Sequence, residues 1–191
     1  MKAEKRGETL IVNESILCIK RYFDLHDSTV ISINELIKII IQKNESPITG
    51  FDETEEFEDL VKNELTYAFI KEFEAVKLTL IELKACINEM KRLNGIIDEA
   101  QYDKAISSSG RCSNILLSLR NFFKSTLTHF RRDYMLKKKL HEALIHVDSS
   151  CENEINRLQL MWKETPFLFT ILHKHKVNKL IMECKQFLQK P

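Results

Sequence analysis

Apolar residues recur at steps of three and four along this sequence, and this spacing most limits what the chain can fold into. Such steps place side chains on one face of an α-helix, as in a coiled coil. The spacing predicts two long helices that bury these faces against other helices. The first series has one polar member and comprises Ile16, Ile19, Phe23, His26, Val30, Ile33, Ile37 and Ile40; the second comprises Phe69, Phe73, Val76, Leu80, Leu83, Ile87 and Met90.

The low content of glycine and proline points the same way. The 191 residues include only four Gly and three Pro, too few for the turns of a many-stranded sheet. With 43% apolar residues the chain can bury a core. The predicted fold class is all-α: a long antiparallel coiled-coil hairpin followed by a C-terminal module of one long and two shorter helices.

Turn and capping residues divide the chain into four segments. Asn13 is suited to cap the first helix, Pro47 and Gly50 permit a chain reversal, and Asp52 with Glu55 resembles the start of the second helix. Gly95, Gly110 and the serines from 107 to 109 suggest a linker. We therefore predict a flexible leader at 1–12, a helical hairpin at 13–93, a linker at 94–112 and a helical module at 113–191.

Within the C-terminal module we predict three helices. The longest runs from Ser113 to about His146, with an apolar stripe along one side. Ser149 and Glu152 form a capping box for a short helix that ends near Glu164. The pair Thr165-Pro166 predicts that the last helix begins there or a few residues later and ends at about Leu188. The stripe of the longest helix comprises Leu116, Leu119, Phe123, Leu127, Phe130, Tyr134 and Leu144.

Charge and cysteine content indicate the compartment. The chain has 29 Lys and Arg against 28 Asp and Glu, so no overall field attracts nucleic acid or an anionic membrane. Five widely spaced cysteines without a CxxC pair favour a reducing compartment. No apolar run approaches the roughly 20 residues needed to span a bilayer. The expected location is nuclear or cytoplasmic, without membrane insertion or secretion.

The sequence contains none of the motifs that mark common catalytic sites. It has no Gly-rich phosphate loop, no G-x-S-x-G and no H-E-x-x-H. His173 and His175 are two apart, which sends them to different faces of a helix and disfavours a shared metal. We expect His26 to be a buried, hydrogen-bonded residue of its helix rather than a ligand. The chain is therefore predicted not to be an enzyme and to need no cofactor.

A cluster of cations on the third long helix is the main candidate for a binding site. At about 100° per residue, Arg131 and Lys138 share one edge, and Arg132 and Lys139 share the neighbouring edge. Lys137 points towards the apolar stripe, where its ammonium could reach solvent along the core. The strip is either a solvated helix face or a docking strip for an acidic partner or phosphate. Nucleic acid is the weaker partner, because no exposed aromatic residues alternate with the cations.

Trp162, the only tryptophan, stands in the run Met161-Trp162-Lys163-Glu164-Thr165-Pro166-Phe167. A large ring is usually buried, so we favour a core anchor that fastens the short fourth helix to the third. The alternative is an interface residue that carries binding energy.

These runs resemble the cyclin-dependent kinase 2-interacting protein family. The stretch from Phe130 to Lys138 is similar to its pattern of aromatic, Arg, basic, acidic, three apolar, Lys, basic, and Leu144 and His146 continue the match. The Met161-Trp162 pair, with Pro166 four residues after Trp162, resembles a second motif of the family. Gly95-Ile96 with Tyr102 resembles a third. The similarity covers about residues 122 to 188, whereas before Asn94 it is only a coarse helical match; Lys139 departs from a small polar residue in the family.

The resemblance implies a function as a small subunit that assembles with AAA-type ATPase subunits and a second small helical protein. Such an assembly would act in ribosome large-subunit maturation and in DNA replication and checkpoint maintenance, with the ATPase chemistry in the partners. Arg131, Arg132, Lys137, Lys138, Lys139, Trp162 and Pro166 are the candidate contacts. The alternatives are a structural coiled-coil tether of cytoskeletal or kinetochore type, and a weak nucleic-acid-binding protein.

Overall fold

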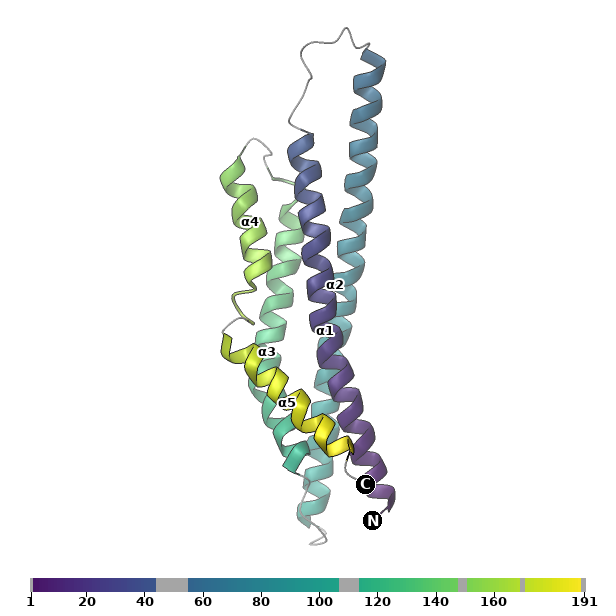
Figure 1. Ribbon diagram of the computed structural model, residues 1–191, viewed down its shortest axis with the longest axis vertical. Coiled ribbons are helices and arrows are strands. Elements are labelled where there is room, and N and C mark those ends of the chain that lie inside the picture. Colours follow the sequence, from purple (N-terminus) through teal and green to yellow (C-terminus); the bar gives the residue numbers. More distant parts are fainter. Residues whose placement is uncertain (1, 44–54, 107–113, 148–150, 169–170, 190–191) are drawn as a thin grey trace. The chain divides into compact units, whose positions relative to one another are not determined.

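The computed structural model of this protein contains five helices and no strand among the residues that it describes (Figure 1). The helices are α1 (Lys2–Gln42), α2 (Glu55–Ile106), α3 (Asn114–Ala143), α4 (Glu152–Glu164) and α5 (Ile171–Gln189). The prediction of an all-α fold is confirmed. No described helix combines the length and the apolar character that a membrane crossing requires. The described residues are 2–43, 55–106, 114–147, 151–168 and 171–189; of 2–5, 55–58, 103–106 and 171–175 only the backbone is described.

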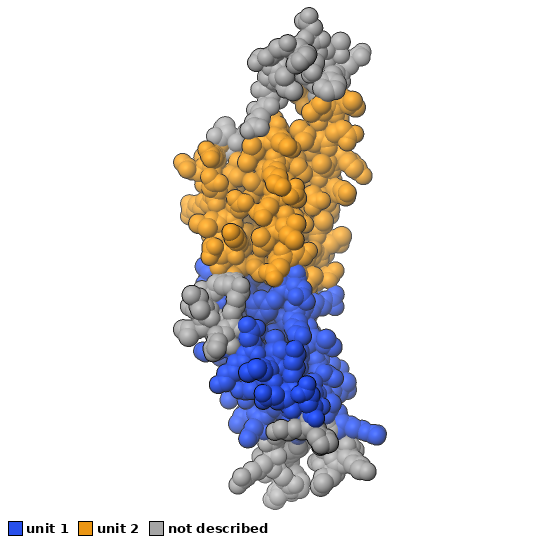
Figure 2. Space-filling view, in the orientation of Figure 1, with its two compact units in different colours: residues 1–24, 83–134, 166–191 blue, residues 25–82, 135–165 orange. Residues whose placement is uncertain are grey.

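The chain forms two compact units, each built from several separated segments (Figure 2). Helices α1, α2 and α3 each contribute a part to both units, α5 belongs to the first unit and α4 to the second. Unit 1 comprises residues 1–24, 83–134 and 166–191, and unit 2 comprises residues 25–82 and 135–165.

Unit 1 is held together by apolar side chains from four helices. In this unit α1 and α2 run in opposite directions, because Glu14 pairs with Arg92 whereas Cys18, further along α1, contacts Cys86, earlier in α2. Phe130 of α3 packs edge-on against Tyr22 of α1, with ring centroids 4.6 Å apart. The buried residues include Val12, Ile16, Ile19 and Tyr22 of α1, Leu83, Ile87, Met90, Leu93 and Ile97 of α2, Leu116, Leu119, Phe123 and Phe130 of α3, and Val177, Leu180 and Cys184 of α5.

The predicted flexible leader at 1–12 is wrong for residues 2–12, which form the first turns of α1. Val12 is fully buried, and Ile16 is also buried four residues later on the same face of the helix. The apolar face thus begins before Asn13, which lies exposed inside α1 and does not cap it.

The predicted linker at 94–112 is wrong up to Ile106, where α2 ends. Leu93 and Ile97 are fully buried and continue the apolar face of α2, and Gly95 has no heavy atom within 4 Å of the position of a Cβ. Asp98 pairs with Arg120 and Lys124 of α3; burial raises the pKa of Asp98, but these two hydrogen bonds outweigh it and lower the pKa. These core contacts therefore stabilise the helix by more than Gly95 destabilises it. Residues 107–112 lie outside the described residues.

Unit 2 has its own core, formed by the last part of α1, the first part of α2, the end of α3 and α4. The predicted stripes of α1 and α2 supply half of its buried apolar residues. Lys43, just after α1, lies over the Phe69 ring at 5.6 Å, so the part of α2 before Phe69 extends past the end of α1 (Figure 1). The buried apolar residues are Ile33, Leu36, Ile37, Ile40, Val76, Leu80, Leu140, Leu144, Ile155 and Trp162.

The ends of the last helices differ from their predicted capping. Cys151 occupies the N-cap of α4 and makes no side-chain capping bond, while Ser149 lies outside the described residues, as do Pro47, Gly50 and Asp52. Thr165 does not start α5 but ends α4, with φ of 36° and ψ of 67°. Pro166 disfavours a helical conformation at the residue before it, so α4 stops there, and α5 begins only at Ile171.

Candidate functional site

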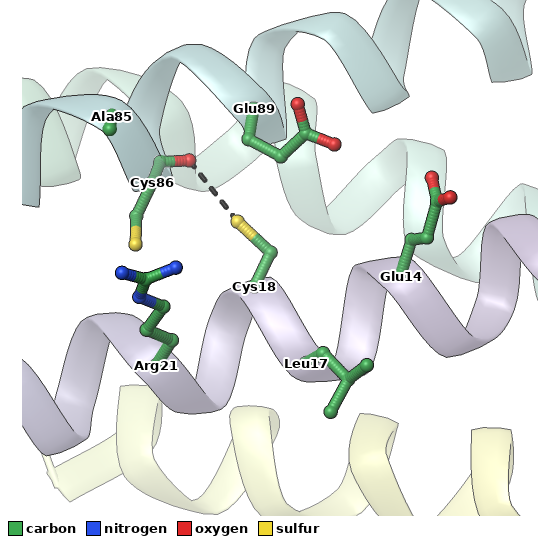
Figure 3. Close-up of a pocket in the computed structure, with 7 residues that line it drawn as sticks. All are labelled: Glu14, Leu17, Cys18, Arg21, Ala85, Cys86 and Glu89. Atoms are coloured by element: carbon green, nitrogen blue, oxygen red, sulfur yellow. Dashed lines mark hydrogen bonds between the residues drawn. The ribbon is translucent and has the colours of Figure 1, made fainter. Parts of the chain in front are cut away.

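A concave site described in unit 1 lies between α1 and α2 (Figure 3). The pocket encloses about 470 Å³ and is open to solvent. Its walls combine apolar side chains, two thiols and charged groups at the rim. The lining residues are Glu14, Leu17, Cys18 and Arg21 of α1 with Ala85, Cys86 and Glu89 of α2.

The Cys18 thiol of this pocket is not poised as a nucleophile. The Cys18 thiol donates to the Cys86 carbonyl oxygen at 3.2 Å, and both residues are buried. The neighbouring Cys86 thiol and burial raise the pKa of Cys18 far above its ordinary value, so the thiol stays protonated. A thiolate is the reactive form of cysteine, so Cys18 lacks the activation that a catalytic cysteine needs.

The two acids at the rim of the pocket are both ion-paired with Arg92. Its guanidinium donates to Glu14 at 2.9 Å and to Glu89 at 2.6 Å. The hydrogen bond from Arg92 lowers the pKa of Glu89, which therefore stays ionised. Among the residues with described side chains, no three His, Cys, Asp or Glu groups are placed to hold a metal ion. This pocket therefore offers an apolar recess with a charged rim.

Thiol accessibility gives a direct check on this arrangement. In a Cys112→Ser variant we expect one thiol, Cys151, to react quickly with Ellman's reagent at pH 8, because Cys151 is exposed. Cys18, Cys86 and Cys184 are buried, and burial raises the pKa of Cys184 to about 12. These three should react only in guanidinium chloride. A fast thiol that persists after Cys151→Ser would contradict the burial of Cys18, Cys86 or Cys184.

The cation strip predicted on α3 is exposed except at one position. Arg131, Arg132 and Lys139 are exposed, and no described residue forms a hydrogen bond or ion pair with them. Lys138 is exposed and pairs with Glu142 at 3.6 Å. Arg131 and Arg132 belong to unit 1, and Lys138 and Lys139 to unit 2.

Lys137 is the exception, because it is buried with only 1% of its surface exposed. It lies seven residues after Phe130 and seven before Leu144, both of which are buried, so the helix repeat turns it into the core. The expectation that its ammonium reaches solvent is wrong. Lys137 is not exposed for a partner in this structure.

Trp162 is a core residue of unit 2 rather than an exposed contact. Its ring is 1% exposed, and its indole N–H donates to the Thr29 hydroxyl of α1 at 3.1 Å. The Thr29 hydroxyl in turn donates to the His26 carbonyl oxygen at 2.7 Å. This contact fastens α4 to α1, whereas the sequence suggested an attachment to α3. Pro166, the last candidate contact, is exposed.

Buried polar groups near the strip were missed by the sequence reasoning. Asp133 is fully buried and accepts a hydrogen bond from the Tyr22 hydroxyl at 2.7 Å. Burial and the adjacent Asp133 charge raise the pKa of Tyr22 well above 10. Asp133 lies three residues after Phe130, a spacing that places it at the edge of the apolar face and could have suggested its burial. His26 is buried as expected, with Nε2 3.9 Å from Asp27; the side chains of His173 and His175 are not described.

His141 makes the stability of unit 2 depend on pH. Its Nε2 lies 2.9 Å from the Phe73 carbonyl oxygen and its ring stacks on Phe73. Burial lowers the pKa of His141 below 6.5, although the hydrogen bond to Phe73 acts the other way. The unfolded chain therefore binds a proton more readily, so this contribution to stability is full above pH 6.5 and is lost as the pH falls towards the folded-state pKa.

We expect the free energy of unfolding to decrease between pH 7.5 and pH 5, and the decrease to be smaller in His141→Gln. Denaturation in guanidinium chloride at several pH values measures it. His146→Gln is the matched control, because His146 is exposed in the same unit. Equal pH slopes in wild type and His141→Gln would contradict the prediction.

No protein-family model matches the chain, and no curated protein matches it significantly.

Proposed function

We propose that this protein is a non-catalytic helical adaptor that docks onto protein partners through cations on α3. The observation that carries the proposal is the exposure of Arg131, Arg132 and Lys139 without a partner among the described residues. A guanidinium on a helix surface is well suited to bind a carboxylate through two parallel hydrogen bonds. An acidic protein surface is therefore the partner that fits these residues.

The sequence resemblance supports a particular assembly. In this proposal the partners are AAA-type ATPase subunits and a second small helical protein, and the assembly acts in ribosome large-subunit maturation and in DNA replication and checkpoint maintenance. The adaptor itself contributes surface rather than chemistry, in keeping with the protonated Cys18 thiol and the ion-paired acids of its pocket.

Charge reversal tests the docking residues. We expect Arg131→Glu with Lys138→Glu to reduce recovery of co-purified partners at least about tenfold, because each substitution replaces attraction by repulsion. The circular-dichroism signal of the helices should be unchanged, since both residues are exposed. Lys20→Glu with Lys163→Glu, two exposed lysines of α1 and α4, provides the control. Equal recovery by the Arg131/Lys138 variant and the control would remove these cations from the interface.

A further inference from the structure

The first part of α2 carries a second exposed face, independent of the cations on α3. In unit 2, five large apolar side chains of α2 are more than half exposed. One is Ile70, and the other four are Leu60 at 58%, Tyr67 at 69%, Leu78 at 61% and Ile81 at 59%. Scattered exposed apolar residues are ordinary, but these four recur along one side of one helix. We define the outer face of α2 as Leu60, Glu64, Tyr67, Lys71, Glu74, Leu78 and Ile81.

The spacing of this outer face is that of a helix-pairing surface. Its members follow one another in steps of four and three without interruption from Leu60 to Ile81, which lie about 32 Å apart at 1.5 Å per residue. The buried side of the same helix, which includes Val76 and Leu80, points to the opposite side, into the core of unit 2. Ile70 is also exposed and borders the outer face, which widens its apolar area. A second helix is the element whose shape such a face fits.

The charges on the face select the orientation of that helix. If two copies of α2 paired in parallel and in register, Glu64, Lys71 and Glu74 would each meet the same charge. In an antiparallel pair with its axis between Glu72 and Phe73, Lys71 faces Glu74 of the other copy, twice by symmetry. In the same register Tyr67 faces Leu78, and Glu64 faces Ile81 near the ends of the contact, where a carboxylate reaches water. The face is therefore complementary to itself, as a two-fold interface requires.

The charge of the outer face disfavours a lipid membrane as its occupant. Two acids and one base give it no attraction to an anionic membrane. Glu74 already holds Lys77 of its own helix at 2.9 Å, so in the pair its carboxylate would be shared between Lys77 and the opposing Lys71.

We propose that the outer face of α2 binds a second copy of this chain, antiparallel, with reciprocal Lys71–Glu74 ion pairs at the centre and Tyr67–Leu78 contacts on either side. This contact leaves the cations of α3 to other partners and does not depend on the adaptor function proposed above.

Sedimentation equilibrium of the full chain tests this contact. We expect a shift from monomer to dimer between about 1 and 300 µM. Lys71→Glu, which creates two like-charged pairs, should raise the midpoint concentration at least about tenfold, and so should Leu78→Asp. The double exchange Lys71→Glu with Glu74→Lys should return the midpoint to within about threefold of wild type, because it restores both opposite-charge pairs.

Arg157→Glu is the matched control, an exposed charge reversal on α4 of the same unit that should leave the midpoint unchanged. Circular dichroism verifies that each variant is folded. A chain that stays monomeric at every concentration would overturn the proposal. The face would then be left to a different protein. A dimer that ignores Lys71→Glu, or that the double exchange does not restore, would also overturn it.

Discussion

Replacing Trp162 by alanine is expected to lower the free energy of unfolding by about 3–5 kcal/mol. The indole is almost completely buried in unit 2, so its removal leaves a cavity as well as losing the transfer of a large ring out of water. The hydrogen bond from the indole to Thr29 is lost at the same time. Denaturation in guanidinium chloride, followed by circular dichroism, measures the change.

Leu160→Ala is the matched control on the same helix, because Leu160 is 59% exposed. Its expected effect is below about 0.5 kcal/mol. Thr29→Val should cost about 1–3 kcal/mol, because it removes only the acceptor and leaves the indole N–H buried. Equal effects of Trp162→Ala and Leu160→Ala would show that α4 is not attached through this ring.

Phe130→Ala is expected to cost about 3–5 kcal/mol in unit 1. The Phe130 ring is 1% exposed and packs edge-on against three aromatic rings, with centroid distances of 4.6 Å to Tyr22, 6.1 Å to Phe23 and 6.5 Å to Phe122. Such pairs add to the burial of area because the ring quadrupoles interact favourably. The same denaturation experiment measures this loss.

Phe167→Ala provides the comparison, since Phe167 also belongs to unit 1 but is exposed. We expect it to change the free energy of unfolding by less than about 1 kcal/mol. If the two alanine variants were equally stable, the aromatic cluster around Phe130 would not be the core of this unit.

Helix existence could be predicted from the sequence, whereas helix ends could not. Period and composition identified the predicted stripes, and residues such as Ile19, Leu83 and Phe123 are fully buried. Asn13 and Gly95 have local preferences for a helix end, but burial of Val12, Leu93 and Ile97 on either side of them outweighs those preferences. A residue's preference for a helix end contributes about 1 kcal/mol, which is less than the burial of a large apolar side chain contributes.

The candidate contacts divide in the same way. Helix geometry placed Arg131, Arg132, Lys138 and Lys139 correctly on the exposed side, since that inference needs only the angle per residue. The same geometry predicted that Lys137 points inward. It could not predict how deeply Lys137 is buried, because burial depends on the neighbouring helices. The pocket between α1 and α2 joins Cys18 to Cys86, residues distant in sequence, and spacing within one helix carries no signal for such a pair.

The central claim is that this chain binds protein partners through the cations of α3, and affinity purification with quantitative mass spectrometry tests it most directly. The wild-type chain and the Arg131→Glu/Lys138→Glu variant would be tagged and expressed at equal levels. We predict that AAA-type ATPase subunits and a second small helical protein co-purify with the wild type and are depleted at least about tenfold with the variant. Recovery of no such subunits with the wild type, or undiminished recovery with the variant, would contradict it.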